Sequence, residues 1–305
     1  MKFSDLDKIK CENKTVLITG ANAGLGFEVA LYFASKGAQV IGCGRSLTRL
    51  KQAQANILAL YPHARLEMLE CDLSSFKSIE TFAQTIRFEY PTLDILMNNA
   101  GVMAIPYATT QEGYEMQLGV NHIGHFLLTA LLMPHLNSSA RIINVSSMAH
   151  MNGTFDLEDP FFKSRPYHSF KAYAQSKLAN LLFTHEFNER MQHNDKNIMA
   201  ISAHPGVAMT SLFDKVETNS FMKWMKPIFG KMIPNARQGA QPLIVAALHP
   251  QAKANDFFGP RSILKKDEVK ISKMSSLAKD KSLQKGLWAL SEQWTQHIKK
   301  ENKPE

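Results

Sequence analysis

Short apolar runs alternate with longer segments of helical periodicity along most of this chain. The first run, residues 14–19, is rich in β-branched side chains, which predicts a buried strand. The segment 24–36 has the composition of a helix and is followed by Gly37, a common helix terminator. Farther along, a helix over about 170–190 is predicted by apolar residues at helical spacing, namely Leu178, Leu181, Leu182, Phe183 and Phe187.

The alternation continues without a break, which favours a single domain of the α/β class. With helices between the strands, it predicts a Rossmann-type, doubly wound parallel sheet of about seven strands. We assign 1–13 to an N-terminal extension, 14–260 to a dinucleotide-binding catalytic domain and 261–305 to a basic, helical C-terminal extension of it. The strands are expected near 15–19, 39–43, 65–70, 94–98, 141–146, 199–203 and 254–258.

A glycine-rich turn joins the first predicted strand to the first predicted helix. Gly20, Gly24 and Gly26 follow directly after the strand. Glycines let a backbone approach a pyrophosphate closely, and a helix N-terminus supplies free N–H groups and the positive end of its dipole. Although the spacing is Gly-xxx-Gly-x-Gly, the strand, turn and helix form the context that a dinucleotide site requires.

The end of the second predicted strand carries the signal for the type of dinucleotide. An acidic residue there binds the ribose 2′-hydroxyl of NAD, whereas an arginine suits the 2′-phosphate of NADP. The strand 39–43 is followed by Gly44-Arg45-Ser46 and has no carboxylate at its end. Arg45 therefore favours NADP(H), with NAD(H) as the alternative cofactor.

Tyr173 and Lys177 are four residues apart on the predicted helix 170–190 and therefore share one of its faces. A free phenol titrates near ~10, which is too high for ready proton exchange at neutral pH. We expect the ammonium group of Lys177 to lower the pKa of Tyr173 and so to suit it to general acid-base catalysis.

Composition and charge exclude several other classes of protein. The 305 residues are 45% hydrophobic, and the three cysteines, Cys11, Cys43 and Cys71, have no metal-ligand spacing. No signal peptide or apolar run long enough to span a bilayer is visible, so we expect a cytoplasmic protein. Of the net charge of +8, residues 261–305 supply +5, because they hold eleven Lys and Arg against six Asp and Glu. Such a local basic tail is not a nucleic-acid surface, so we expect no nucleic-acid partner.

The ordered set of motifs resembles the short-chain dehydrogenase/reductase family over about 14–259. Within that family, the runs Asn121-His-Ile-Gly-His-Phe and Ser146-Ser-Met-Ala-His resemble the retinol dehydrogenase group. The resemblance implies a catalytic tetrad of Asn121, Ser147, Tyr173 and Lys177, with Ser146 as the alternative serine. It also implies a cofactor site made of Thr19, Gly20, Asn22, Ala23, Gly24, Leu25, Gly26, Arg45, Asp72, Leu73, Asn99, Ala100, Gly101, Val120, Tyr173, Lys177, Pro205, Gly206, Val207 and Thr210.

The segment after the sixth predicted strand is expected to select the substrate. Residues 209–235 are rich in Met and aromatic side chains, which predicts a lid over an apolar ligand. The alternatives are weak peripheral contact of 213–233 with a membrane surface and plain packing on the core. An insert at 155–167 borders the same site, with its carboxylates Asp156, Glu158 and Asp159 expected to face solvent. The pocket is predicted to include Ser147, Ala149, Phe155, Phe213 and Trp224.

The predicted function is hydride transfer between NADP(H) and an apolar aldehyde, ketone or alcohol, as in a retinol dehydrogenase-like carbonyl reductase. The alternatives are a sugar epimerase or dehydratase on the same scaffold and a protein that binds NADP(H) without turnover. His122, His125 and His150 lack metal-ligand spacing and are interpreted as packing or hydrogen-bonding residues, so no metal is expected. The family resemblance is compatible with a homo-oligomer.

Overall fold

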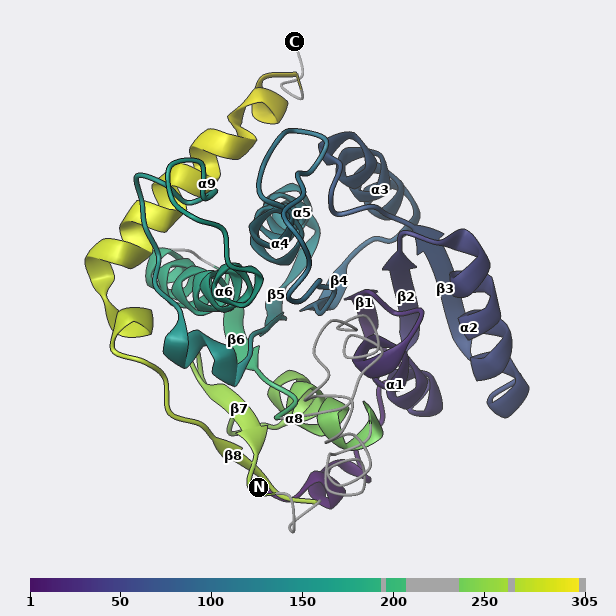
Figure 1. The fold of residues 1–305 in the computed structure, drawn as a ribbon. Helices are drawn as coiled ribbons and strands as arrows, with labels where there is room; N and C mark the ends of the chain where they lie inside the picture. The colour runs from purple at the N-terminus through teal and green to yellow at the C-terminus, as the bar shows by residue number, and fades with distance from the viewer. Residues whose placement is uncertain (193–195, 207–235, 263–266, 302–305) are drawn as a thin grey trace, which may run out of the picture.

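The computed structural model describes residues 1–192, 196–206, 236–262 and 267–301, which form one α/β domain. Its centre is a sheet in the order β3-β2-β1-β4-β5-β6-β7-β8, with helices on both faces (Figure 1). Strands β1 to β7 run parallel to one another, as predicted. The strands are β1 Thr15–Thr19, β2 Gln39–Gly44, β3 Arg65–Glu70, β4 Leu93–Asn98, β5 Leu136–Val145, β6 Met199–Ala203, β7 Phe257–Pro260 and β8 Val269–Ile271.

The predicted strand count of about seven omits β8, which runs antiparallel to β7 at the edge of the sheet. The strand has only three residues, of which Val269 alone is buried, so it is too short for its apolar pattern to be identified from the sequence. The predicted start of the last strand at 254 is also wrong, because Asn255 adopts φ +67°, in the left-handed region that a strand excludes. Strand β5 begins at Leu136, five residues before the prediction, across an irregularity in its register with β4.

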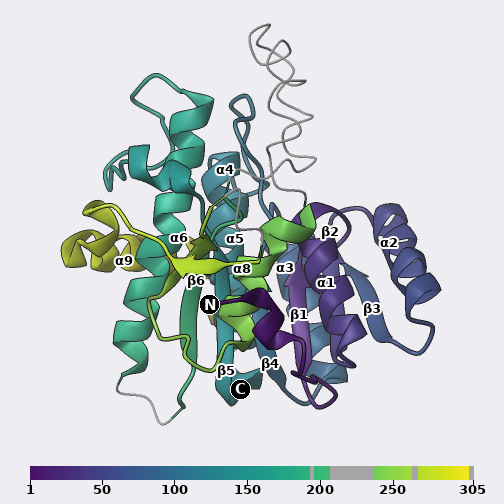
Figure 2. The ribbon, with the colours of Figure 1, turned by 90° about the horizontal axis from the view of Figure 1, so that it is seen from below.

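Helices cover both faces of the sheet, as a doubly wound fold requires. Helices α1, α2 and α8 lie on one face, and α3, α5 and α6 lie on the other (Figure 1). Helix α9 packs against α6 on the side away from the sheet (Figures 1 and 2). The helices are α1 Gly24–Ser35, α2 Leu47–Leu60, α3 Phe76–Glu89, α4 Met116–Leu118, α5 Gly124–Leu132, α6 Ser169–Met191, α8 Ala236–Leu248 and α9 Lys281–Glu301.

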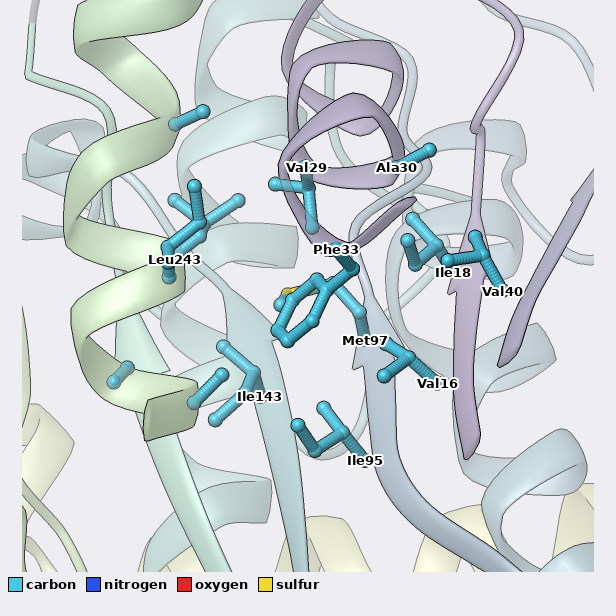
Figure 3. Close-up of a cluster of buried hydrophobic side chains, with 14 of the residues drawn as sticks. Val16, Ile18, Val29, Ala30, Phe33, Val40, Ile95, Met97, Ile143 and Leu243 are labelled. Carbon is cyan, nitrogen blue, oxygen red and sulfur yellow. The ribbon is translucent and has the colours of Figure 1, made fainter. Parts of the chain in front are cut away.

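The core beneath α1 and α8 fixes the first strand and helix against each other. Figure 3 shows Phe33 of α1 lying between Leu243 of α8 and the sheet residues Met97 and Ile143. The ring of Phe33 is fully buried, and removing such a ring costs about 3–5 kcal/mol. This packing holds the turn between β1 and α1, where the phosphate site is predicted.

Aromatic packing joins α6 to α9 on the opposite face. The rings of Phe183 on α6 and Trp288 on α9 are stacked with their centroids 5.9 Å apart. His122 and Ser291 of α9 form a buried hydrogen bond of 2.8 Å nearby. In the part of the chain that the structure describes, no helix has both the length and the apolar character needed to cross a membrane.

Candidate active site

The predicted catalytic residues meet where the carboxyl ends of β1, β4 and β5 approach α6. Parallel strands bring their carboxyl ends to one edge, where open α/β sheets bind ligands. Thr19 ends β1, Asn98 ends β4, and Ser147 follows β5 by two residues. Tyr173 and Lys177 lie on α6 and are 7% and 4% exposed.

The glycine turn forms a tight backbone cradle. Gly20 and Gly24 have φ values of +70° and +57°, which favour glycine. A Cβ at Gly26 would lie only 2.2 Å from the Gly20 carbonyl oxygen and 2.6 Å from Asn99 Nδ2. Ala23 caps α1 without a side-chain hydrogen bond, so the first-turn amide groups have no side-chain partner there. Free amides at a helix N-terminus fit the phosphate of a dinucleotide.

Thr19 links this cradle to the chain that leaves β4. Its Oγ1 accepts hydrogen bonds from the backbone N–H groups of Asn99 and Ala100, both at 2.9 Å. Asn99 Nδ2 donates to the Thr19 carbonyl oxygen at 2.8 Å. Gly101 follows this contact, and a Cβ there would lie 2.9 Å from Asn121 Oδ1 and 3.5 Å from Lys177 Nζ. The cradle and the predicted catalytic residues therefore share one continuous framework.

The residues predicted to hold the adenosine end lie at the ends of β2 and β3. Arg45 directly follows β2 and is exposed, and it forms no ion pair with another described residue. Asp72 is half-buried, and its Oδ1 accepts from the backbone N–H and the hydroxyl of Ser74. Leu73 is buried, and its carbonyl oxygen lies close to Gly124 at the start of α5.

Asn121 lies in a π-helical turn, Gly119–Ile123, that includes Val120 and joins α4 to α5. Its Oδ1 accepts from the backbone N–H of Val102 at 2.8 Å, and its Nδ2 donates to the carbonyl of Val102 and to Ser176 Oγ, both at 2.9 Å. The side chain therefore connects the segment after β4 to α6. Such π-bulges in helices frequently occur at functional sites.

The two candidate serines have different partners. The hydroxyl of Ser146 donates to the Lys177 carbonyl oxygen at 2.7 Å and is buried. Ser147 is half-buried, and its hydroxyl interacts with the Tyr173 side chain, which lowers the pKa of the phenol against the effect of burial. Ser147, the serine preferred from the sequence, is therefore the one that acts on the tyrosine hydroxyl.

Burial dominates the electrostatics of Tyr173 and Lys177. Burial raises the pKa of Tyr173, and the hydrogen bond with Ser147 opposes that rise. Burial lowers the pKa of Lys177 to about 8, and its Nζ donates to the Val145 carbonyl oxygen at 3.0 Å. The expected lowering of the Tyr173 pKa by Lys177 is therefore wrong for this arrangement. Lys177 Nζ lies 5.8 Å from the centre of the tyrosine ring, and desolvation is the larger effect.

The segment after β6 closes another side of the site. Gly206 has φ +74°, and its N–H donates to His204 Nδ1 at 3.0 Å, which turns the chain after Pro205. Burial lowers the pKa of His204 to about 4, so the ring is neutral at pH 7. Of the remaining predicted residues in this region, Val207, Thr210, Phe213 and Trp224 lie outside the described residues, as does the lid at 209–235.

One carboxylate of the insert at 155–167 differs from its predicted position. Phe155 is buried in a core cluster with Phe161, Leu118 and Leu178, and its place in the substrate pocket remains a prediction. Asp159 was expected to face solvent but is buried, because it accepts hydrogen bonds from backbone groups within the same insert. Ala149 is half-buried and its N–H donates to Ser147 Oγ at 3.2 Å, which places it beside the candidate serine.

A buried polar network beneath the site was not predicted from the sequence. Asn98 Nδ2 donates to Asn144 Oδ1 at 2.9 Å, and Asn144 Nδ2 donates to Thr184 Oγ1 at 2.9 Å. Thr184 in turn shares a 2.8 Å hydrogen bond with Ser202 on β6. The available signal is a polar residue within or at the end of an apolar strand, as at Asn98 and Asn144.

The three histidines singled out from the sequence form hydrogen bonds, as interpreted. His122 bonds to Ser291, His125 to Thr19, and His150 to the Ser147 carbonyl oxygen. Among the described residues, no cluster of His, Cys, Asp or Glu has the arrangement of a metal site.

Comparison with known proteins agrees with this geometry. The sequence profile described as short chain dehydrogenase matches residues 14–220. Human retinol dehydrogenase 13 is 38% identical over 291 residues, covering 93% of this chain and 85% of its own length. The chloroplastic short-chain dehydrogenase TIC 32 A of Brassica napus is 36% identical, covering 93% and 89%.

A solved structure extends the likeness over nearly the whole fold. The crystal structure of an uncharacterized protein from Mycobacterium paratuberculosis has a TM-score of 0.77 and 36% identity, covering 95% of this chain and 96% of its own. The family profile matches the region that contains the cradle, the Ser147–Tyr173 pair and the buried lysine. The chain therefore belongs to the short chain dehydrogenase family of oxidoreductases.

Proposed function

We propose that this protein is an NADP(H)-dependent oxidoreductase that transfers hydride between the nicotinamide and an apolar aldehyde, ketone or alcohol. The observation that carries the proposal is the position of Tyr173, which interacts with Ser147 and lies beside the buried Lys177, whose Nζ is 5.8 Å from the centre of the tyrosine ring. A hydroxyl pair of this kind can donate to one substrate oxygen, which is the requirement for reducing a carbonyl group.

The cradle fits a dinucleotide because its shape depends on the absence of side chains. Gly26 leaves no space for a Cβ against the Gly20 carbonyl, and the N-terminus of α1 faces the turn with its positive dipole end. Bound there, the cofactor supplies or accepts the hydride. The residues that would hold it are the turn 19–26, Asn99 to Gly101, Asp72 and Arg45.

The side chains of the protein would control the proton and the developing charge. In the direction of carbonyl reduction, Tyr173 donates a proton to the substrate oxygen, and Ser147 donates a hydrogen bond to the same oxygen. The ammonium group of Lys177, held by the Val145 carbonyl, adds positive charge beside the phenol. Asn121 fixes the segment at Val102 against α6 and so keeps these groups in register.

The preference for NADP(H) is supported by Arg45. Its guanidinium group is exposed at the end of β2, with no described acidic partner that would neutralise its charge. A free guanidinium group can bind a phosphate through two parallel hydrogen bonds. This position suits the 2′-phosphate that distinguishes NADP from NAD.

An apolar substrate is supported by side chains near the catalytic hydroxyl groups. Met148 and Met151 follow Ser147 in the next turn and are both exposed. Phe170 is also exposed, and its ring centre lies 6.3 Å from that of Tyr173. Exposed Met and aromatic side chains favour contact with varied apolar groups. The name of the related human retinol dehydrogenase points toward the same class of substrate.

The test follows consumption of NADPH by absorbance with aldehydes and ketones from short-chain to retinal-sized, with NADH and Tyr173→Phe as controls. We expect turnover with NADPH, little with NADH and none in the variant, while the variant still binds NADPH. Retained turnover in Tyr173→Phe would remove the tyrosine from the mechanism. Tight NADPH binding with no turnover of any carbonyl would favour a binding protein instead.

A further inference from the structure

His125 joins the cofactor turn to the catalytic asparagine through both of its ring nitrogens. Its Nε2 lies 2.8 Å from Thr19 Oγ1, and its Nδ1 lies 3.0 Å from the backbone carbonyl oxygen of Asn121. The ring lies at the start of α5 and is 2% exposed.

The partners of the ring determine where its proton lies. A carbonyl oxygen can only accept, so Nδ1 must carry the hydrogen that it donates to Asn121. Thr19 Oγ1 already accepts from Asn99 N and Ala100 N, which occupies both of its lone pairs. The Thr19 hydroxyl must therefore donate its hydrogen, and its acceptor at 2.8 Å is His125 Nε2.

This assignment leaves the histidine neutral. Thr19 donates to Nε2 of the ring, and Nδ1 of the ring donates to the Asn121 carbonyl oxygen. Burial, with a smaller contribution from the positive charge of Lys177, lowers the pKa of His125 to about 4. A second acceptor for the threonine, the Met97 carbonyl oxygen, is more distant at 3.3 Å.

We infer that His125 is a positioning residue, fixed as the Nδ1–H tautomer, which couples the Thr19 anchor of the cofactor turn to the Asn121 backbone at the catalytic π-helical turn. Its ε side orients Thr19 and through it the amides at Asn99 and Ala100. Its δ side orients the Asn121 carbonyl, which lies on the same turn as the side chain that holds Val102 and Ser176. The expected effect of His125 on the reaction rate rests on the proposed function.

Two amide substitutions separate the two sides of the ring. In His125→Asn, the amide nitrogen occupies the position of Nδ1 and can still donate to Asn121, while the bond to Thr19 is lost. In His125→Gln, the longer side chain brings its amide oxygen toward the position of Nε2, where it can accept from Thr19, while the bond to Asn121 is lost. His125→Phe removes both bonds and keeps the ring.

The expected result is a split between cofactor affinity and rate. Measured by NADPH fluorescence, the dissociation constant should rise roughly three- to tenfold in His125→Asn, as loss of one hydrogen bond implies, and less in His125→Gln. The value of kcat should fall more in His125→Gln than in His125→Asn, and His125→Phe should show both losses. Equal factors in the two amide variants would overturn the coupling role, since loss of packing alone affects both alike.

A spectroscopic measurement on the unsubstituted protein tests the bond pattern without turnover. Two-bond ¹⁵N–¹H correlation spectra distinguish the two neutral tautomers and the charged ring. We expect the His125 proton on Nδ1, with and without NADPH. A proton on Nε2, or on both nitrogens, would overturn the inference even if every variant failed to fold. If no carbonyl is turned over, the proposed function fails, while the tautomer and the NADPH affinities still decide the role of His125.

Discussion

Ser146 and Ser147 are adjacent in the sequence, yet their hydroxyl groups interact with different parts of helix α6. Ser146 donates to the backbone carbonyl of Lys177 at 2.7 Å, whereas Ser147 interacts with the side chain of Tyr173. One serine therefore holds the helix in place, and the other acts on the hydroxyl group of the proposed proton donor.

Replacing Ser147 with Ala should reduce kcat about 10²- to 10³-fold, the usual cost of losing one donor to a developing oxyanion. NADPH affinity should be nearly unchanged, because Ser147 does not line the glycine cradle. Steady-state kinetics and NADPH fluorescence measure the two quantities. Ser146→Ala is the matched control, and its main effect should be a loss of about 1–3 kcal/mol in the free energy of unfolding. A larger kcat loss in Ser146→Ala than in Ser147→Ala would reverse the two roles.

Replacing Gly26 with Ala should weaken NADPH binding more than tenfold. The added methyl would lie 2.2 Å from the Gly20 carbonyl oxygen, which is backbone and cannot move without distorting the cradle. Alanine normally favours a helix by about 1 kcal/mol over glycine, so the sign of the effect separates steric conflict from helix propensity. Titration of NADPH fluorescence measures the affinity.

The control for Gly26→Ala is Gly113→Ala. Gly113 has φ +85°, but a Cβ there would meet nothing within 4 Å. This variant should lose some stability from backbone strain and keep its NADPH affinity. Normal affinity in Gly26→Ala would show that the cradle is not the phosphate site.

Replacing Arg45 with Ala should raise the dissociation constant for NADPH about 10- to 100-fold, as loss of a charge-assisted hydrogen bond implies. Affinity for NADH should change little, because NADH has no 2′-phosphate. Arg87→Ala provides a control with the same loss of charge, since Arg87 is exposed in the last turn of α3 at the other end of the sheet. Equal losses for NADPH and NADH in Arg45→Ala would argue against the proposed cofactor preference.

The pH dependence of carbonyl reduction should follow the ammonium group of Lys177. Burial places its pKa at about 8, below the ordinary 10.5, so the charge is present below pH 8 and is lost as the pH rises. The value of kcat/KM for reduction should therefore be level below pH 8 and fall about tenfold per pH unit above it. In Lys177→Arg the rate should be lower, but this fall should disappear because arginine stays charged.

The stability of the fold should show the opposite trend over the same window. The unfolded chain keeps Lys177 protonated up to its ordinary pKa, whereas the folded chain releases the proton above about 8. The unfolded state therefore binds more protons between these values, and this group makes folding more favourable as the pH rises through them. Urea unfolding at pH 8 and pH 10, compared with Lys177→Arg, separates loss of activity from loss of structure.

Much of the fold could be predicted from local patterns. Strand β1, with its β-branched run, and strand β3 begin and end where expected, and α6 spans Ser169–Met191 against a prediction of about 170–190. The glycines at 20, 24 and 26 indicated the cradle because its tight backbone geometry depends on residues that are close in the sequence. In the same way, the spacing of Tyr173 and Lys177 placed both on one helix.

The features that were missed depend on three-dimensional contacts that no sequence pattern indicates. Asp159 was misplaced because its burial comes with hydrogen bonds from backbone groups within the insert. The rise in the Tyr173 pKa could not be predicted either. The spacing indicates that Lys177 is near, but it does not indicate how far burial removes the phenol from water. The link from Thr19 to His125 spans 106 positions, and no periodicity in the sequence indicates it.

The position of α6 between the sheet and α9 has a mechanical consequence. The sheet fixes one side of the catalytic helix through Asn144 and Thr184, and α9 fixes the other through the stacked rings of Phe183 and Trp288. Rotation of α6 about its own axis would break both interfaces at once. Tyr173 and Lys177 are thus held in fixed positions by α6. Any change of shape that accommodates different substrates would therefore have to come from the loops around this helix.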